Sequence, residues 1–311
     1  MEDALHRKGV LTMKNIDKKK SILADLSLLL VAIVWGGGFI AVKGALDNVT
    51  PFYMMAMRFS ISVIIMLIIF RKKVKLITKN ELKVGTIVGL LLFLGFAAQT
   101  IGMQYTTAGK NAFLTGTNVV IVPFLYWVIS KRRPDIYSLV SAFLCFVGIG
   151  MLTLDGGIHI GLGDSLTLLC AVFFAGHIVS VGFFTEKVDP ILLVIIQLGA
   201  AAVFSIIAAL IYEPIPQPLN SDTIFAIGYL AIFSTMIAFI IQNVAQKYTT
   251  STHAAIILCL ESVFGSILSV IVLNELFTSK MVLGCLTIFI AIITTETKWD
   301  FLKKKKISAT P

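Results

Sequence analysis

The sequence predicts an all-α, polytopic membrane protein whose ten transmembrane helices form two inverted five-helix repeats. The composition is the first reason, since 57% of the 311 residues are hydrophobic and 14% are charged, and the mean hydropathy is +0.93. The second is a series of ten apolar stretches, each close to the roughly 20 residues that a helix needs to cross a bilayer. The third is an internal repeat that relates the two halves of the chain.

The ten apolar stretches follow one another with short polar connections. We expect spans near residues 25–43, 51–70, 84–105, 109–130, 135–154, 163–184, 190–212, 222–246, 251–273 and 279–297. The repeats then comprise residues 22–154 and 155–297, with basic tails at residues 1–21 and 298–311. Because each repeat holds an odd number of spans, the second crosses the bilayer in the opposite sense to the first.

The internal repeat rests on polar residues, because apolar segments resemble one another too readily. Residues 105–149 align with residues 248–292 without a gap. In this register the coinciding polar residues are Gln99 with Gln242, Tyr105 with Tyr248, Thr106 with Thr249 and Thr107 with Thr250. A second register, in the earlier part of each half, pairs Asp25 with Asp164, Pro51 with Pro190 and Arg58 with Gln197. The whole five-span unit is therefore expected to be duplicated.

Lysine and arginine are concentrated in alternate connections, which predicts the orientation. Of the 26 basic residues, 22 fall in the two tails and in the connections on the same side of the membrane. Since cytoplasmic segments carry the excess of positive charge, we expect both termini in the cytoplasm and a multi-pass location in the cell (inner) membrane. The net charge of +9 then faces anionic membrane lipid, and a nucleic-acid partner is not expected.

Several short motifs resemble one transporter family. They are Trp35-Gly36 with Phe39-Ile40, Arg58-Phe59, Ala108-Gly109 with Ala112-Phe113-Leu114, Glu261, and Asn274-Glu275-Leu276 before Gly284. In this order, over about residues 22–297, the chain is similar to EamA-type members of the drug/metabolite transporter superfamily. The resemblance implies a ten-helix bacterial inner-membrane carrier, often an exporter of amino acids, other metabolites or drugs. Ser262 stands where the family often has proline, so the resemblance does not imply a proline kink in span 9.

Charged side chains inside the spans are candidate site residues, because they are costly in hydrocarbon and mark pathways or pairs. At about 1.5 Å per residue, Glu261 and its repeat-mate Asn118 lie closest to the bilayer midplane. Glu261 could handle substrate or protons, or it could join two helices. Arg58, about a third of the way into span 2, could hold a substrate carboxylate, or pair with a helix end or an acidic neighbour.

Uncharged polar and aromatic groups complete the candidate set. Gln99 and Gln242 lie toward opposite ends of the expected cavity, where each could bind polar cargo or another helix. Trp35, before three glycines, could stack on an organic cation, while the glycines could bring backbone close to cargo or to another helix. His177 could relay protons or serve as a hydrogen-bonded packing residue. Pro123 is expected to bend span 4.

Several nucleotide-binding and catalytic motifs are missing from the sequence, which argues against the corresponding classes of function. A GxxxxGK[ST] motif is missing, so ATP is not expected to drive the protein directly. GxSxG and HExxH are also missing, and the four cysteines show no CxxC spacing, so we expect no enzyme activity, cofactor or metal.

The resulting hypothesis is a secondary active transporter that moves a small organic metabolite, such as an amino acid, by alternating access. Export is the expected direction and protons are a candidate coupling ion. A facilitative exchanger, a lipid or drug flippase, an intramembrane enzyme and a sensor stay open as alternatives, as do a monomer and a homodimer.

Overall fold

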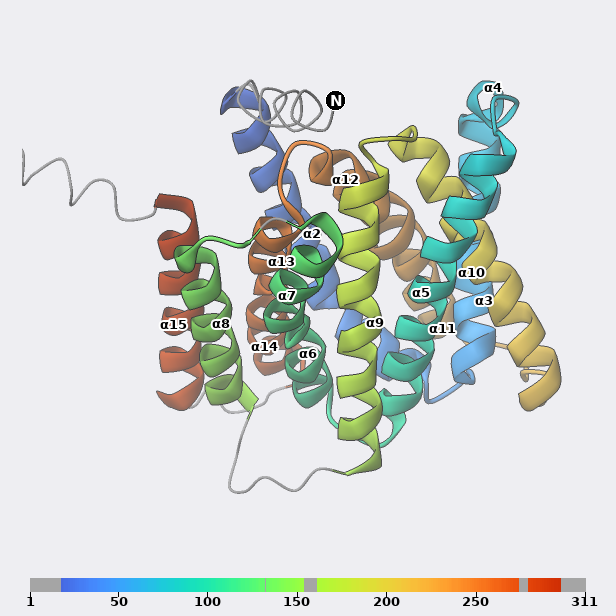
Figure 1. The fold of residues 1–311 in the computed structure, drawn as a ribbon. Helices are drawn as coiled ribbons and strands as arrows, with labels where there is room; N and C mark the ends of the chain where they lie inside the picture. The colour runs from blue at the N-terminus through green and yellow to red at the C-terminus, as the bar shows by residue number, and fades with distance from the viewer. Residues whose placement is uncertain (1–17, 132, 154–160, 274–278, 298–311) are drawn as a thin grey trace, which may run out of the picture.

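A computed structural model of the chain describes residues 18–131, 133–153, 161–273 and 279–297 (Figure 1). Within these ranges the secondary structure is helical and contains no β-strand. The helices are α2 (Lys18–Ala45), α3 (Pro51–Ile69), α4 (Arg71–Val74), α5 (Lys79–Gln104), α6 (Ala108–Gly116), α7 (Asn118–Ser130), α8 (Ile136–Thr153), α9 (Leu162–Phe184), α10 (Pro190–Tyr212), α11 (Ser221–Tyr229), η1 (Leu230–Ile237), α12 (Ala238–Gln246), α13 (Ser251–Leu258), α14 (Leu260–Leu273) and α15 (Ser279–Thr297). The expected all-α class is confirmed.

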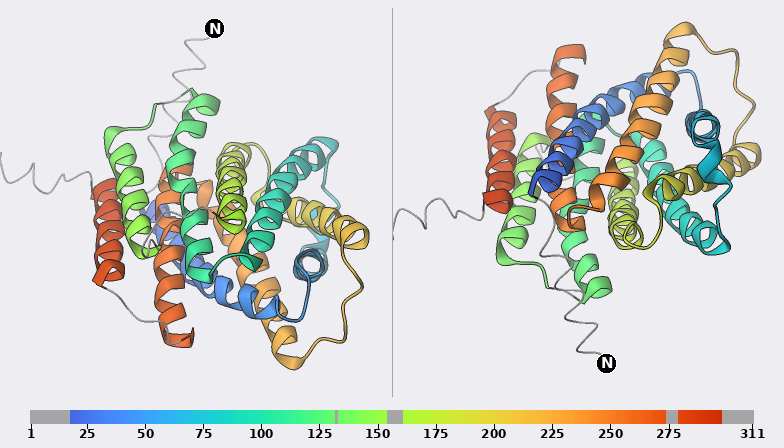
Figure 2. Two further views of the ribbon diagram at one scale, coloured as in Figure 1. Left: turned by 90° about the horizontal axis from the view of Figure 1, so that it is seen from below. Right: turned by 90° about the horizontal axis from the view of Figure 1, so that it is seen from above.

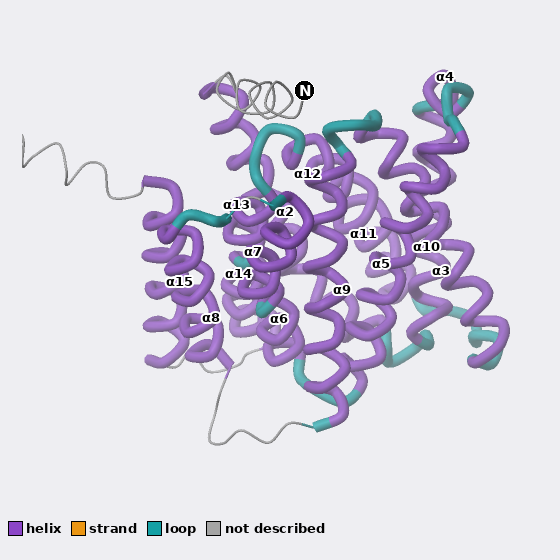
Figure 3. The backbone as a smooth tube through the Cα atoms, in the orientation of Figure 1, coloured by secondary structure: helices purple, strands orange, loops and turns teal. Residues whose placement is uncertain are grey.

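The helices account for all ten expected spans. In the described part of the chain, eight helical segments are long and apolar enough to cross a membrane. α8 and α15 supply the other two, with shorter apolar stretches at Ile136–Gly148 and Val282–Thr294. Loops join the helices mainly at the two faces of the bundle (Figure 3).

Three spans are not single α-helices. Span 4 consists of α6 and α7, which meet at Thr117, and span 9 consists of α13 and α14, which meet at Cys259. Span 8 contains the π-helix η1 between α11 and α12. The interruption of span 4 falls at Thr117, whereas Pro123, the residue expected to bend it, lies inside α7.

Two helices at equivalent positions of the repeats begin with the same hydrogen-bonded cap. The Thr107 hydroxyl accepts a hydrogen bond from the Lys110 amide at the start of α6. The Thr250 hydroxyl does the same for the His253 amide at the start of α13, and both bonds are 3.2 Å long. These are equivalent positions in the aligned repeats, so the same capping residue begins spans 4 and 9.

The bundle has two outer helix pairs and two central groups. α3 packs against α10 at one edge, and α8 packs against α15 at the other (Figures 1 and 2). Between these pairs, α5, α6, α7 and α9 pack together as a first lobe. A second lobe contains α2, α11, η1, α12, α13 and α14. The lobes consist of equivalent spans from the two repeats, three in each lobe.

The described ends of the chain lie on one face. The start of α2 and the end of α15 are both at the top of the bundle in Figure 1. We call this the terminal face and the other the opposite face. An even number of crossings requires this arrangement.

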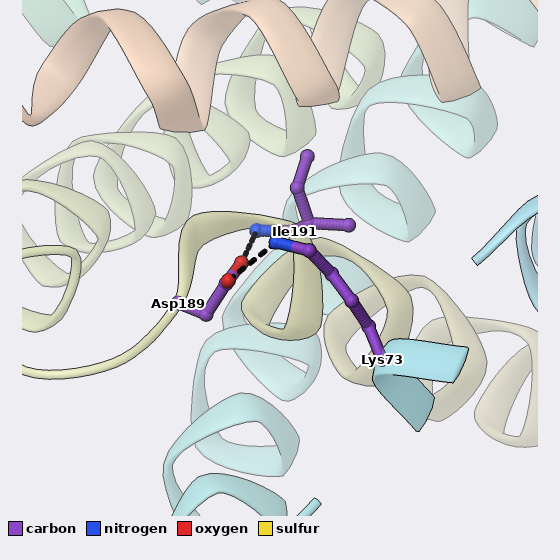
Figure 4. A network of polar contacts seen from close by, with 3 residues as sticks. All are labelled: Lys73, Asp189 and Ile191. Carbon is purple, nitrogen blue, oxygen red and sulfur yellow. Dashed lines mark hydrogen bonds and ion pairs between the residues drawn. The ribbon is translucent and has the colours of Figure 1, made fainter. Parts of the chain in front are cut away.

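The α3–α10 pair is tied together at the terminal face. The Lys73 ammonium lies 2.5 Å from Asp189 Oδ2, and the Ile191 amide donates to the other carboxylate oxygen at 2.8 Å (Figure 4). Burial alone would raise the pKa of the Asp189 carboxyl, but the hydrogen bonds from Lys73 and Ile191 outweigh burial and hold that pKa below its usual value.

A carboxylate ties the same helix pair at the opposite face. Glu213, which follows α10, accepts hydrogen bonds from the Thr50 hydroxyl at 2.6 Å, the Phe52 amide at 2.9 Å and the Tyr53 amide at 3.0 Å. The negative charge thus lies at the positive N-terminal end of α3, where it satisfies free amides. Both ends of the α3–α10 pair are fixed by contacts between the two repeats.

Candidate functional site

A cavity lies between the two lobes. Its lining comes from α2, α3, α5, α6, α7, α9, η1, α12, α13 and α14, so every span contributes except those formed by α8, α10 and α15. The structure brings together all seven candidate residues from the sequence, which are Trp35, Arg58, Gln99, Asn118, His177, Gln242 and Glu261. Whether these residues bind or couple transport stays a prediction, but they share one cavity.

Arg58 is held by hydroxyl groups of span 8. Its side chain is buried, and Nε and one terminal nitrogen lie 2.9 and 2.8 Å from Thr235 Oγ1. The guanidinium also lies over the Phe96 ring, 4.6 Å from its centroid. In the described part of the chain no carboxylate lies within ion-pair distance of Arg58. An acidic neighbour, one of the partners considered for Arg58 from the sequence, is therefore not paired with it in these ranges.

The π-helix η1 positions this contact. A π-helix carries one extra residue in its turn, which displaces backbone groups from their usual partners. Within η1, the Ser234 carbonyl accepts a hydrogen bond from Trp35 Nε1 at 2.9 Å, and the neighbouring Thr235 hydroxyl faces Arg58. Trp35 also packs against Phe239, with ring centroids 5.4 Å apart. The irregular turn therefore joins spans 1, 2 and 8 at the cavity wall.

The interrupted helices place Asn118 and Glu261 at equivalent sites. Asn118 is the first residue of α7, and Glu261 is the second residue of α14. The N-terminal end of a half-helix carries partial positive charge, which favours a carboxylate at Glu261. The Glu261 side chain is only 7% exposed, and neither an ion pair nor a hydrogen bond joins it to another residue within the described ranges.

The two equivalent glutamines differ in their contacts. Gln99 donates from Nε2 to Thr115 Oγ1 at 3.0 Å, so this amide joins spans 3 and 4. Gln242 is 1% exposed, and neither its amide nitrogen nor its amide oxygen has a partner in the described part of the chain. Gln99 thus fits the interhelical interpretation, whereas Gln242 presents an unsatisfied donor and acceptor at the cavity wall.

The glycines after Trp35 serve two purposes. A Cβ atom at Gly36 would lie 2.6 Å from Phe264 Cβ and 2.8 Å from the Gly265 amide nitrogen. α2 and α14 thus approach each other through glycine, as in many membrane helix pairs. Gly38 lines the cavity, and a Cβ there would lie 3.1 Å from Ser234 Oγ.

Hydrogen bonds bridge the two lobes at each end of the cavity. Toward the opposite face, Lys43 Nζ on α2 donates to the carbonyls of Met103 at 3.0 Å and Thr106 at 3.2 Å, where α5 ends. Toward the terminal face, Gln246 Nε2 at the end of α12 donates to the Ile178 carbonyl of α9 at 2.9 Å. Met103 and Gln246 are equivalent in the repeats, so related positions join the lobes at both ends.

Several lining residues were missed in the sequence. The hydroxyl partners have no distinguishing signal, because serine and threonine also satisfy backbone carbonyls within membrane helices. The aromatic walls were missed because phenylalanine is common throughout the apolar spans. The missed residues are Phe96, Thr115, Phe174, Ser234 and Phe239, which line the cavity, and Thr235, which binds Arg58 beside it.

A protein family model matches both halves of the chain. The model, described as the EamA-like transporter family, matches residues 22–154 and again residues 161–297.

Two similar proteins are described as transporters, and a third is described as WAT1-related. An uncharacterized transporter of Archaeoglobus fulgidus is 35% identical over 274 residues, which cover 88% of this chain and 86% of the relative. An uncharacterized transporter of Clostridium kluyveri is 27% identical, with 89% of this chain and 95% of the relative covered. A chloroplastic WAT1-related protein of Arabidopsis thaliana is 25% identical over 83% of this chain and 66% of the relative.

A solved crystal structure has the same fold. It superposes on 90% of this chain and 98% of its own, with a TM-score of 0.75 and 16% sequence identity. At this identity the similarity concerns the fold alone.

Proposed function

The chain belongs to the EamA-like transporter family, and we propose that it is a secondary transporter whose central cavity binds a small organic metabolite during alternating access. An amino acid or a related compound is the favoured cargo. The observation that carries this proposal is the central cavity, which is lined by Arg58 and Glu261 without an opposite charge beside either in the described part of the chain.

Two separated, uncompensated charges suit a cargo with an opposite charge at each end. Burying an unpaired charge is costly, and a bound partner of opposite charge lowers that cost. A zwitterion would place its carboxylate toward Arg58 and its ammonium toward Glu261. Asn118 and Gln242 would orient further polar groups, and Trp35 would pack against an apolar side chain.

The two lobes provide the alternating movement. Breaking the Lys43 contacts would open the cavity toward the opposite face, and breaking the Gln246 contact would open it toward the terminal face. The α3–α10 pair, fixed at both ends, would serve as the frame. Each lobe contains spans from both repeats, residues 22–154 and 155–297, so the lobe that moves at each step would draw on both repeats.

The charge distribution and the family support a proposal for the location and the direction of transport. We propose that the terminal face is cytoplasmic and that the protein lies in the bacterial inner membrane, because basic connections such as that at residues 71–83 lie at this face, where α2 begins and α15 ends. Export is the favoured direction, and Glu261 is the candidate group for proton coupling.

Flux into proteoliposomes tests the proposal. Purified protein would be reconstituted and supplied with each of the twenty labelled amino acids and with simple amines, with and without a pH gradient. Accumulation against a gradient of cargo supports a coupled transporter, whereas equilibration alone indicates a facilitative exchanger. Lipid movement, chemical conversion, or binding without flux would instead indicate a flippase, an enzyme or a sensor, respectively.

Glu261→Gln provides the matched variant, since it removes the charge and keeps the shape. Loss of one charge partner typically costs a few kcal/mol, so transport at low cargo concentration should fall on the order of tenfold or more. Glu81→Gln is the control, because the partly exposed Glu81 caps α5 far from the cavity lining and glutamine can cap it as well. Equal transport and equal pH dependence in the Glu261 variant and the control would remove the role assigned to Glu261.

A further inference from the structure

A chain of hydrogen bonds leads from the cavity wall into the bundle. His177 Nε2 lies 2.7 Å from Gln197 Oε1, and Gln197 Nε2 donates to Asn243 Oδ1 at 3.2 Å. Asn243 Nδ2 then donates to the backbone carbonyl of Phe239 at 2.9 Å. The three side chains are 2%, 0% and 0% exposed, so water does not replace these partners from outside the bundle.

The backbone carbonyl at the end of this chain fixes the direction of every bond. A carbonyl oxygen only accepts, so Asn243 must turn its NH2 group toward Phe239 and its oxygen toward Gln197. Gln197 must then turn its NH2 group toward Asn243 and its oxygen toward His177. Reversing either amide would bring two oxygens or two NH2 groups together, so the direction follows from the chemistry of the partners.

The tautomer of His177 follows from this direction. Because Gln197 offers an oxygen, His177 Nε2 must carry the hydrogen. A neutral imidazole has one N–H and one lone pair, so Nδ1 is then a hydrogen-bond acceptor. His177 lines the cavity, and in the described part of the chain no group donates a hydrogen bond to Nδ1.

We infer that His177 Nδ1 accepts a hydrogen bond from an N–H group of the cargo, and that Gln197 and Asn243 are positioning residues that hold the required tautomer. The inference rests on the proposed function and deepens it, because it selects cargo with a primary or secondary ammonium over cargo with a fully methylated nitrogen. The charge of these two nitrogen groups is the same, and only the number of N–H donors differs.

The surroundings of His177 favour such a cargo. Its ring packs edge-on against Phe239, with centroids 5.7 Å apart, and Phe174 lines the cavity from the same helix α9. Aromatic faces attract cations, and Glu261 on the same cavity adds a negative charge. A methylated ammonium would satisfy these attractions but would leave Nδ1 without a donor, which is unfavourable for a buried acceptor.

Nitrogen NMR of His177 tests the tautomer without any cargo. The chain contains four histidines, so replacing His6, His159 and His253 with glutamine leaves one labelled imidazole in lipid nanodiscs. At a pH where this ring is neutral, we expect the proton on Nε2. A proton on Nδ1, or an even mixture of the two tautomers, would overturn the inference.

Two variants and a control test the positioning residues. Gln197→Met removes the oxygen that faces Nε2, and Asn243→Leu removes the group that orients Gln197, so both should populate the Nδ1–H tautomer. Ser205→Ala is the control, because among the described residues the buried Ser205 on α10 bonds only within its own helix, to the Ala201 carbonyl at 2.7 Å. An unchanged tautomer in both variants would overturn the positioning role.

L-Phenylalanine and N,N,N-trimethyl-L-phenylalanine test the contact with cargo. They share ring, carboxylate and charge, and only the first has N–H donors. We expect L-phenylalanine to shift the Nδ1 resonance and the trimethylated compound to bind at least fivefold more weakly, without that shift. His177→Gln keeps a polar group at the position of Nε2 but has no acceptor at the position of Nδ1, so this variant should bind both compounds equally.

Three outcomes separate this inference from the proposed function. Equal binding of the two probes, or no Nδ1 shift with L-phenylalanine, overturns the cargo contact even if the protein transports another compound. An Nε2–H tautomer with the expected Nδ1 shift supports the contact even in a protein that shows no flux. Absence of flux for every tested compound overturns only the proposed transport.

Discussion

Gly36→Ala tests the close approach of α2 and α14 that forms one wall of the cavity. The added Cβ atom would lie 2.6 Å from Phe264 Cβ and 2.8 Å from the Gly265 amide nitrogen. Both atoms belong to or adjoin the backbone, so relief requires the helices to separate. Overpacking of this kind costs about 1–3 kcal/mol, while replacing glycine in a helix returns at most about 1 kcal/mol.

Gly44→Ala supplies the matched control on the same helix. Nothing lies within 4 Å of a Cβ atom at Gly44, so this variant gains helix propensity without a clash. The difference between the two variants therefore isolates the clash, and Gly36→Ala should be the less stable by about 1–3 kcal/mol.

Thermal unfolding in detergent measures this difference. A maleimide dye that fluoresces on reaction with thiols would report unfolding, because Cys145, Cys170 and Cys259 are buried and free. We expect a lower unfolding temperature for Gly36→Ala than for the native chain, and a native or slightly higher one for Gly44→Ala. Equal unfolding temperatures in the two variants would refute the close packing of α2 on α14.

Two further predictions concern contacts between the repeats. Thr235→Val should destabilise the protein by about 1–3 kcal/mol, because it leaves the Arg58 guanidinium without its main acceptor. Thr223→Val is the control and should be nearly neutral, because the buried Thr223 hydroxyl has no partner in the described ranges. Similar unfolding temperatures for the two variants would contradict the Arg58 contact. Lys73→Met should lower stability by at most about 1 kcal/mol at neutral pH, since the ion pair with Asp189 is partly exposed. Because folding lowers the pKa of Asp189, this contribution is present above the unfolded value of about 3.9 and is lost as the pH falls through the folded value; a gap between variant and native chain that persists at lower pH would contradict it.

The sequence predicts the positions of the spans better than their interior shape. Hydropathy locates α10 at its observed limits, Pro190–Tyr212, because the apolar length is fixed by the bilayer. It does not locate the interruptions at Thr117 and Cys259 or the π-helix η1. Gly116 precedes the first break, but glycines also occur within the continuous helix α2, and neither glycine nor proline adjoins Cys259. Backbone irregularity inside a membrane is stabilised by neighbouring helices, which a single span does not reveal.

The sequence also predicts the location of the site better than it predicts the hydrogen-bond partners of the site residues. Polar side chains within spans are costly in hydrocarbon, so the sequence predicts Arg58, His177 and Glu261 as candidate site residues, and the three line one cavity. Their partners depend on the register between helices. The hydroxyl of Thr235 as the partner of Arg58, and the missing partners of Gln242, therefore emerge only from the structure.

The repeats share a backbone but differ in the chemistry that they bring to the cavity. Gly38 and Arg58 of the first repeat are equivalent to His177 and Gln197 of the second. In the second repeat the large imidazole contacts its glutamine at 2.7 Å. In the first repeat Gly38 lets Ser234 approach closely, because a Cβ there would lie 3.1 Å from Ser234 Oγ, and Arg58 reaches across to span 8. The first repeat thus contributes a cation, Arg58, and the second contributes a hydrogen-bond acceptor, His177. A symmetric cargo would satisfy only one of them in either orientation, so the asymmetry favours a cargo whose two ends differ in charge and in hydrogen-bonding capacity.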